Sequence, residues 1–261
     1  MKYAVIGGSV LTQVDGLEAD NILHEEIIRT PYGQTSSAFT VYQYAGNELV
    51  YFNRHGKTHT VAPHQVNYRA NMYALKQLGV THVIASAAVG GVHADMPPLQ
   101  CVIPDQIIDY SYAREHTYNE KNNQEVKHID FSYPFTESLR QRLISAAFSQ
   151  HINCRTWATY GVTQGPRLET VAEIRRMQND GCDIVGMTAM PEAALARELE
   201  MAYASCAIVV NWAAGKTPSV ENTTENIVRD VISMQQIKTC IEKGNKQLQK
   251  IVSFVVSGES C

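Results

Sequence analysis

The sequence predicts a single α/β domain, residues 1–261, with a mixed, mostly parallel central sheet flanked by helices. Short apolar runs typical of buried strands alternate along the chain with segments of helical periodicity. Such alternation is typical of parallel strands whose faces are covered by helices. No stretch rich in Pro, Gly or Ser divides the chain, and no internal repeat is visible, so we expect one domain.

The first half of the chain supplies three strands and one helix in this prediction. Apolar runs ending in Gly or polar residues predict strands over residues 3–6, 48–52 and 83–89. Residues 66–78 have helical spacing, with Tyr68, Met72, Leu75 and Leu78 on one face, and Gly79 closes that helix.

The second half continues the alternation. We expect strands over residues 102–108, 159–163, 184–187 and 204–210. Helices are expected over residues 139–149, 169–178 and 191–199, the last with a proline in its first turn. A long C-terminal helical region, 223–255, is expected to break or bend near Gly244. Residues 110–135 are polar and irregular, and a loop of that length in a compact domain is often functional.

Composition and charge narrow the class of protein. The net charge of −4 argues against a nucleic-acid-binding surface and against a polybasic membrane patch. The six cysteines are scattered without a C-x-x-C pair, which is typical of reduced thiols in the cytoplasm. No apolar stretch approaches the ~20 residues of a membrane span. The apolar run after Lys2 stops at Gly7, so we interpret it as a first strand and not as a signal peptide.

Two segments near the N-terminus carry groups suited to an anion. Gly7-Gly8-Ser9 follows the first strand, where backbone N–H groups and a hydroxyl can bind phosphate; a plain turn is the alternative. Arg54-His55-Gly56 follows the second strand, and arginine recognises phosphate with paired donors; the alternative is a surface arginine at a turn. His55, His59 and His64 lack the spacing of a zinc site, so no metal is expected.

Four further segments end strands with groups suited to a ligand. Ser86 to Gly91 is built of small residues that allow close approach to the backbone. Glu169 follows a Gly-Pro turn, Thr188 follows the strand at 184–187, and Asn211 follows the strand at 204–210. The plain alternatives are a tight strand-to-loop turn for residues 86–91, the positive end of a helix dipole for Glu169 and a turn-forming role for Asn211. Core packing is the alternative for Met187, beside Thr188. Because the carboxyl ends of parallel strands meet at one edge, we expect these groups to converge.

These motifs resemble one family over nearly the whole chain, the trimeric purine nucleoside phosphorylases and methylthioadenosine phosphorylases. The resemblance is strongest to the bacterial S-methyl-5′-thioinosine phosphorylases. The matching segments, which occur in the same order and spacing, are I-G-G-S at Ile6–Ser9, R-H-G at Arg54–Gly56, H-Q-V-N-Y-R-A-N at His64–Asn71, G-P-R-L-E-T at Gly165–Thr170 and G-M-T-A-M-P-E-A at Gly186–Ala193.

The resemblance implies a role for each candidate residue and a fold of the nucleoside phosphorylase type. The groups implied to hold phosphate are Ser9, Arg54, His55, Thr188 and the backbone at Ala87 and Ala88. Met187 is implied to lie against the ribose, and Glu169 and Asn211 to read the purine; His55, Glu169 and Asn211 are expected to act in catalysis. The 5′ pocket is implied to be lined by His59, Thr224, Ile227, Val228 and, from a neighbouring subunit, His128.

The expected reaction is phosphorolysis of a purine nucleoside in purine salvage, by a cytoplasmic homotrimer. Phosphate is a co-substrate, and no cofactor, metal, nucleic-acid or membrane partner is expected. Glu169 and Asn211 favour a 6-oxopurine, with 5′-methylthioinosine first and inosine or guanosine also accepted. The alternatives are a methylthioadenosine phosphorylase, a nucleosidase that uses water, and a relative that binds nucleosides without turnover.

Three residues depart from the family pattern. Val10 stands where a glycine is usual in the phosphate turn, and Ala87 stands where Asn or Thr is usual. Trp212 follows Asn211 where a smaller residue or proline is common. We expect these departures to affect catalytic efficiency more than the fold.

Overall fold

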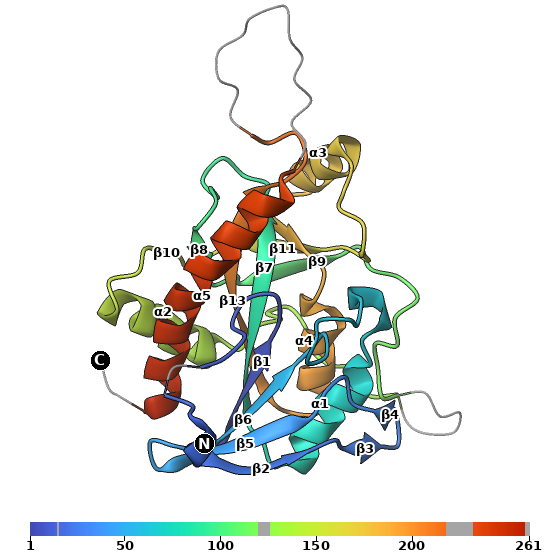
Figure 1. Ribbon diagram of the computed structural model, residues 1–261. Coiled ribbons are helices and arrows are strands. Elements are labelled where there is room, and N and C mark those ends of the chain that lie inside the picture. Colours follow the sequence, from blue (N-terminus) through green and yellow to red (C-terminus); the bar gives the residue numbers. More distant parts are fainter. Residues whose placement is uncertain (15, 120–125, 218–231, 259–261) are drawn as a thin grey trace, which may run out of the picture.

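The computed structural model describes residues 1–14, 16–119, 126–217 and 232–258, and these form one α/β domain, as predicted (Figure 1). Among the described residues, eleven strands form one mixed sheet whose main path runs β10-β8-β13-β7-β1-β6-β5-β2. The strands are β1 Tyr3–Gly7, β2 Ile22–Glu26, β3 Arg29–Thr30, β4 Gly33–Gln34, β5 Phe39–Tyr44, β6 Asn47–Asn53, β7 His82–Gly91, β8 Cys101–Val102, β9 Gln106–Asp109, β10 Cys154–Arg155, β11 Thr159–Val162, β12 Ile184–Gly186 and β13 Ala202–Trp212.

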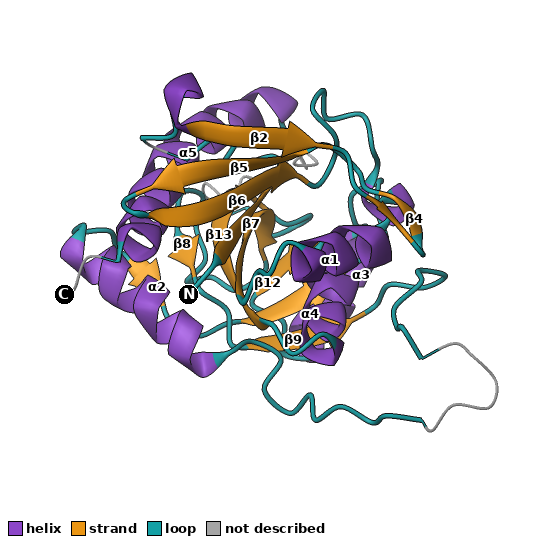
Figure 2. Cartoon of the chain, turned by 90° about the horizontal axis from the view of Figure 1, so that it is seen from below, coloured by secondary structure: helices purple, strands orange, loops and turns teal. Residues whose placement is uncertain are grey.

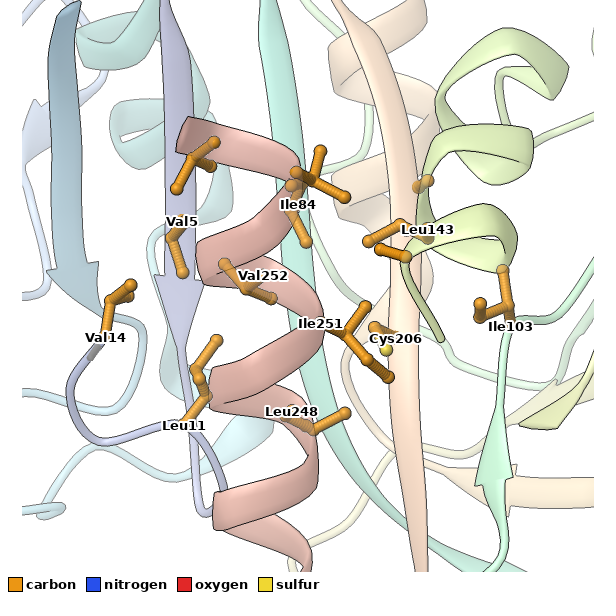
Figure 3. Close-up of a cluster of buried hydrophobic side chains, with 14 of the residues drawn as sticks. Val5, Leu11, Val14, Ile84, Ile103, Leu143, Cys206, Leu248, Ile251 and Val252 are labelled. Atoms are coloured by element: carbon orange, nitrogen blue, oxygen red, sulfur yellow. The ribbon is translucent and has the colours of Figure 1, made fainter. Parts of the chain in front are cut away.

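Helices cover both faces of this sheet (Figure 2). They are α1 Tyr68–Gln77, α2 Glu137–Ser149, α3 Val171–Asn179, α4 Ala189–Glu198 and α5 Met234–Ser257, with short 3₁₀ turns at Ala19–Asn21 and Pro63–Gln65. Leu143 of α2 and Val252 of α5 belong to one buried cluster with Val5 and Ile84 on one face of the sheet (Figure 3). On the other face, α1 and α4 pack against the intervening residues Ala4 and Val83. Successive residues of a strand therefore pack into the cores on opposite faces of the sheet, as the two-residue period of a strand requires.

Four strands at the centre of the sheet run in the same direction. β1 pairs in parallel with β6 and β7, and β7 pairs in parallel with β13. Their carboxyl ends consequently meet at one edge, where an open α/β sheet places its ligands. The pairing of β1 with β7 ends at Ala85 of β7. Beyond that residue, β1 no longer covers this edge of β7.

The predicted strand at 102–108 is wrong in one respect. The structure has two short strands there, β8 and β9, and Pro104 lies between them. A proline has no backbone N–H to donate and interrupts a ladder. β8 joins β13 and β10, whereas β9 joins β11.

The predicted break at Gly244 is also wrong, because α5 runs through it without interruption. A Cβ at Gly244 would lie 2.5 Å from Cγ2 of Ile208 on β13. The glycine therefore permits close packing of helix on strand, and it does not mark a bend. The helix starts at Met234, with Ser233 as its N-cap; residues 223–231 of the predicted region lie outside the described residues.

The remaining differences are small or concern elements that were not predicted. Helix α3 starts at Val171 and not at Glu169, because Thr170 caps it and forms a capping box with Glu173. Strands β2 to β5 were not predicted; β2 is exposed throughout and so lacks the alternation of a half-buried strand. Among the described residues, no helix is long and apolar enough to span a membrane.

Candidate active site

A cavity of about 530 Å³ opens at the carboxyl edge of the parallel strands. Ten of the fourteen predicted site residues line it: Ser9, Arg54, His55, His59, Ala87, Ala88, Glu169, Met187, Thr188 and Asn211. His128 does not line it and is exposed in the loop after β9. Thr224, Ile227 and Val228 lie outside the described residues.

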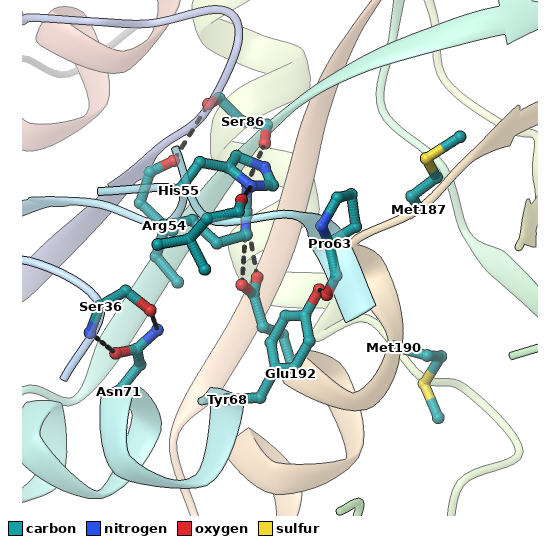
Figure 4. Close-up of polar contacts among 12 residues, drawn as sticks. Ser36, Arg54, His55, Pro63, Tyr68, Asn71, Ser86, Met187, Met190 and Glu192 are labelled. Atoms are coloured by element: carbon teal, nitrogen blue, oxygen red, sulfur yellow. Dashed lines mark hydrogen bonds and ion pairs between the residues drawn. The ribbon is translucent and has the colours of Figure 1, made fainter. Parts of the chain in front are cut away.

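Arg54 follows β6 and is the most buried charged group of the cavity, with 1 % of its surface exposed. Its Nε and Nη2 donate to the two carboxylate oxygens of Glu192, the second at 2.9 Å (Figure 4). Tyr203 Oη donates to Glu192 at 2.9 Å, and Arg54 Nη1 donates to the Ser86 carbonyl at 3.2 Å. Burial alone would lower the pKa of Arg54, but the charge and hydrogen bonds of Glu192 outweigh it and raise the pKa.

The sequence analysis gave Glu192 no role beyond its place in the segment Gly186–Ala193. The structure makes it the counter-ion that fixes the arginine, and its own exposure is 1 %. No local spacing signals this pair, since the two residues are separated by 138 positions. A charged residue in the first turn, among the apolar residues that α4 buries, was the available signal.

His55 is buried beside Arg54, and its Nδ1 lies 2.9 Å from the Val61 carbonyl oxygen. A carbonyl only accepts, so Nδ1 carries the hydrogen and Nε2 carries a lone pair when the ring is neutral. Burial first, and then the charge of Arg54, lower the pKa of His55 to about 4. At neutral pH the ring is uncharged and can accept a hydrogen bond at Nε2.

Ser9 and the glycines before it form the turn that follows β1. A Cβ at Gly8 would lie 3.0 Å from Arg54 Nη1, so a larger residue at this position would crowd the guanidinium. Val10 packs in the core, fully buried, and its carbonyl accepts from Gly8 N at 3.0 Å and from Ser86 Oγ at 2.9 Å. The valine therefore fits a turn where the family usually has glycine.

Glu169 and Asn211 also line the cavity, and β7 and β1 lie between the strand of Asn211, β13, and the strand that precedes Arg54, β6. Glu169 precedes the N-cap of α3 and accepts a hydrogen bond of 2.6 Å from Thr163 Oγ1. Asn211 follows a β-bulge between Val209 and itself, and bulges redirect side chains. Its Nδ2 donates to the Trp212 carbonyl at 2.6 Å, which orients the amide and leaves its second N–H available.

The apolar part of the cavity includes residues that the sequence did not single out. Val61 follows His55, and Met234, Ile237 and Ile241 come from the first turns of α5. The periodicity of that helix predicts an apolar face, but only the tertiary structure shows that its start overhangs the strand ends. Within the described residues, no cluster of three or more His, Cys, Asp or Glu side chains is arranged to hold a metal ion.

Comparison with known proteins agrees with this geometry. The family model of the phosphorylase superfamily matches residues 2–252. The chain belongs to the phosphorylase superfamily. It is 46 % identical over 255 residues to the probable S-methyl-5′-thioinosine phosphorylase of Pseudomonas syringae, covering 98 % of each chain.

Two further comparisons cover most of the chain. The 6-oxopurine nucleoside phosphorylase of Pyrococcus furiosus is 45 % identical over 219 residues, 82 % of this chain and 80 % of that protein. The structure of methylthioadenosine phosphorylase from Schistosoma mansoni in complex with adenine has a TM-score of 0.87 at 28 % identity, covering 100 % of this chain and 93 % of that one. The predicted family and fold class are therefore confirmed.

Replacing Glu192 by Gln is expected to lower the free energy of unfolding by about 3–5 kcal/mol, because it leaves the buried Arg54 charge without its partner. Chemical denaturation of the wild type and the variant measures this. The matched control is Glu48→Gln, which removes an exposed partner of Lys2 and should cost less than about 1 kcal/mol. A loss as small as that of the control would contradict a stabilising role for the pair.

His55 is expected to make stability depend on pH. Between about pH 6.5 and pH 4 the unfolded state binds a proton at this residue and the folded state does not, so the free energy of unfolding should fall as the pH is lowered through that range. His55→Asn keeps a donor for the Val61 carbonyl and should flatten the fall, and urea titrations at pH 4.5 and 7.5 measure the slope. An equal slope in both proteins would show that His55 is not the group responsible.

Proposed function

We propose that this chain cleaves the N-glycosidic bond of a 6-oxopurine nucleoside with inorganic phosphate, giving the free base and a ribose 1-phosphate derivative. 5′-Methylthioinosine is the proposed first substrate, with inosine and guanosine accepted less well. One observation carries the proposal: a single cavity is lined both by Arg54, His55 and Thr188 and by Glu169 and Asn211. The printed names of the relatives above agree with it.

Phosphate is proposed to bind beside Arg54. Glu192 holds two of the three nitrogens of Arg54, so the guanidinium is fixed before the anion arrives. Ser9 and Thr188 contribute hydroxyl groups, and the edge of β7 at Ala87 and Ala88 contributes backbone groups beyond the end of β1. Neutral His55 accepts a hydrogen bond from the protonated oxygen of HPO₄²⁻, which a charged imidazolium would not do.

The base is proposed to leave beside Glu169 and Asn211 as the C1′–N9 bond breaks and a phosphate oxygen bonds to C1′. The sugar passes through an oxocarbenium-like state, and negative charge develops on the purine, which takes up the proton given up by HPO₄²⁻ and leaves as the neutral free base. The free N–H of Asn211 donates to N7 or O6, where that charge accumulates, and Glu169 accepts from N1–H. Met187, which also lines the cavity, is proposed to lie against the ribose. No cofactor or metal takes part in this proposal.

The same two residues favour a 6-oxopurine over adenine. Adenine has a bare N1 where hypoxanthine has N1–H, so the Glu169 carboxylate would face a lone pair. The rival proposal, a methylthioadenosine phosphorylase, draws on the name of the Schistosoma mansoni structure. The two proposals differ in the purine that the cavity accepts, and adenine and hypoxanthine differ at N1.

The methylthio group is proposed to lie against the apolar wall formed by Val61, Met234, Ile237 and Ile241. An apolar pocket favours a methylthio group over a hydroxyl because the hydroxyl loses its water without gaining a partner. Thr224, Ile227, Val228 and the partner contribution of His128 stay predictions, as do the homotrimer and the cytoplasmic location.

The decisive assay compares 5′-methylthioinosine and 5′-methylthioadenosine, each with and without phosphate. We expect base release to require phosphate and the inosine form to be favoured by ~10⁴-fold or more in kcat/KM, since adenine would leave buried polar groups unpaired. Asn211→Asp should shift the ratio towards adenine, whereas the exposed Asn153→Asp should not. Release of the base without phosphate would establish a nucleosidase. Nucleoside binding without base release would establish a non-catalytic protein. Equal use of both nucleosides would refute the assignment of a 6-oxopurine.

Ile237→Thr tests the apolar wall. The variant should lower the preference for methylthioinosine over inosine by ~10-fold or more, the scale of one methylene-sized change in an apolar pocket. Initial rates with both nucleosides give the ratio. Ile144→Thr on α2, which does not line the cavity, is the control, and an unchanged ratio in Ile237→Thr would place the 5′ group elsewhere.

A further inference from the structure

Arg114 lies in the irregular loop after β9 and is buried, with 9 % of its surface exposed. All five of its N–H donors have acceptors within hydrogen-bond distance. Nε donates to Gln164 Oε1 at 3.1 Å; Nη1 donates to the carbonyls of Met187 at 2.9 Å and Met190 at 2.5 Å; Nη2 donates to the carbonyls of Thr163 at 3.0 Å and Gln164 at 2.9 Å. An arginine has five such donors in a rigid plane, so this one is fully used.

The acceptors belong to two segments, 163–164 and 187–190, that adjoin the cavity lining. Thr163 and Gln164 follow β11, Met187 follows β12, and Met190 lies in the first turn of α4 (Figure 4). Thr163 Oγ1 donates to Glu169, so the first segment carries the carboxylate that faces the base. Thr188 lies between the two methionines whose carbonyls accept from Nη1. One guanidinium thus connects the segment that holds Glu169 with the segment that carries Thr188.

Arg114 also contacts the remaining wall. Its guanidinium lies 5.5 Å from the ring centroid of Tyr68, within the range of a cation–π contact. Tyr68 Oη donates to the Pro63 carbonyl at 2.9 Å, and Pro63 lines the cavity (Figure 4). A lysine has at most three donors and no planar face, so it can reproduce neither the five hydrogen bonds nor the stacking.

We infer that Arg114 is a positioning residue that sets the distance between Glu169 and the Met187–Thr188 segment, and so aligns base, ribose and phosphate for transfer. This inference rests on the proposed function. Arg114 does not line the cavity, so it acts through the groups that it holds. A displacement of about 1 Å between reacting groups is enough to lower a rate by about 100-fold.

Arg140 provides a matched control, because it is another buried arginine that donates to backbone carbonyls. Its Nε donates to Pro104 at 2.9 Å, and its Nη2 donates to the carbonyls of Ile103 and Thr156. None of these acceptors lines the cavity. Arg140→Lys therefore reports the cost of weakening a buried arginine that has a structural role alone.

The test compares Arg114→Lys with Arg140→Lys in thermal unfolding and in phosphorolysis of 5′-methylthioinosine. Both variants should unfold at a lower temperature, but only Arg114→Lys should lower kcat, by about 10–100-fold. A double-mutant cycle with Glu169→Gln should be non-additive, so that Arg114→Lys costs less than about threefold once Glu169 is altered. Gln164→Met removes the side-chain acceptor that Nε shares with the backbone N–H of Tyr112, and it should lower kcat several-fold even if Arg114→Lys does not fold.

The inference would be overturned if Arg114→Lys folds and its kcat is unchanged. If Arg114→Lys does not fold, an unchanged kcat in Gln164→Met would overturn it. Additive effects in the cycle would do the same. Calorimetric binding of hypoxanthine separates this failure from failure of the proposed function. If the wild type binds hypoxanthine without phosphate-dependent turnover, the proposed function fails. The double-mutant cycle of Arg114→Lys and Glu169→Gln is then measured as changes in hypoxanthine affinity. If the wild type neither binds hypoxanthine nor turns over, both fail.

Discussion

The buried ion pair between Arg54 and Glu192 is the interaction on which the cavity depends. It joins the end of β6 to the first turn of α4, and Tyr203 of β13 donates to the same carboxylate. A charge in such a site is tolerated only when it is paired and hydrogen-bonded, and here both partners are satisfied. The pair therefore does two things at once: it holds three elements together, and it presents a cation whose orientation is already set.

The surroundings of this pair explain several features that otherwise look unrelated. Gly8 lacks a side chain because the arginine nitrogen occupies that space. His55 stays neutral partly because the neighbouring guanidinium is charged. The end of β1 opposite Ala85 leaves an edge of β7 open beside the arginine. The local chemistry of the cavity is thus a consequence of one fixed positive charge at the edge of a parallel sheet.

Much of the fold could be predicted from sequence because its strands and helices have distinct hydrophobic periods. The prediction failed at Pro104, where tertiary pairing separates two short strands, and at Gly244, where a glycine serves close packing and not a bend. It also missed strands β2 to β5. Ten site residues were found from their positions at strand ends and from family motifs. Glu192 and Arg114 were not, because their roles depend on partners distant in the chain, and a single sequence does not reveal such pairs.

The packing of α5 has a consequence for the order of folding. This last helix contacts the first strand through Val252 and Val5, and its start also forms part of the cavity wall (Figure 3). Contacts between segments so far apart in the chain close only after the intervening residues are in place, which slows folding. During synthesis, the core face of β1 stays uncovered by α5 until that helix has left the ribosome. Recognition of a nucleoside is then a property of the finished chain, and nascent fragments expose an apolar face that favours chaperone binding.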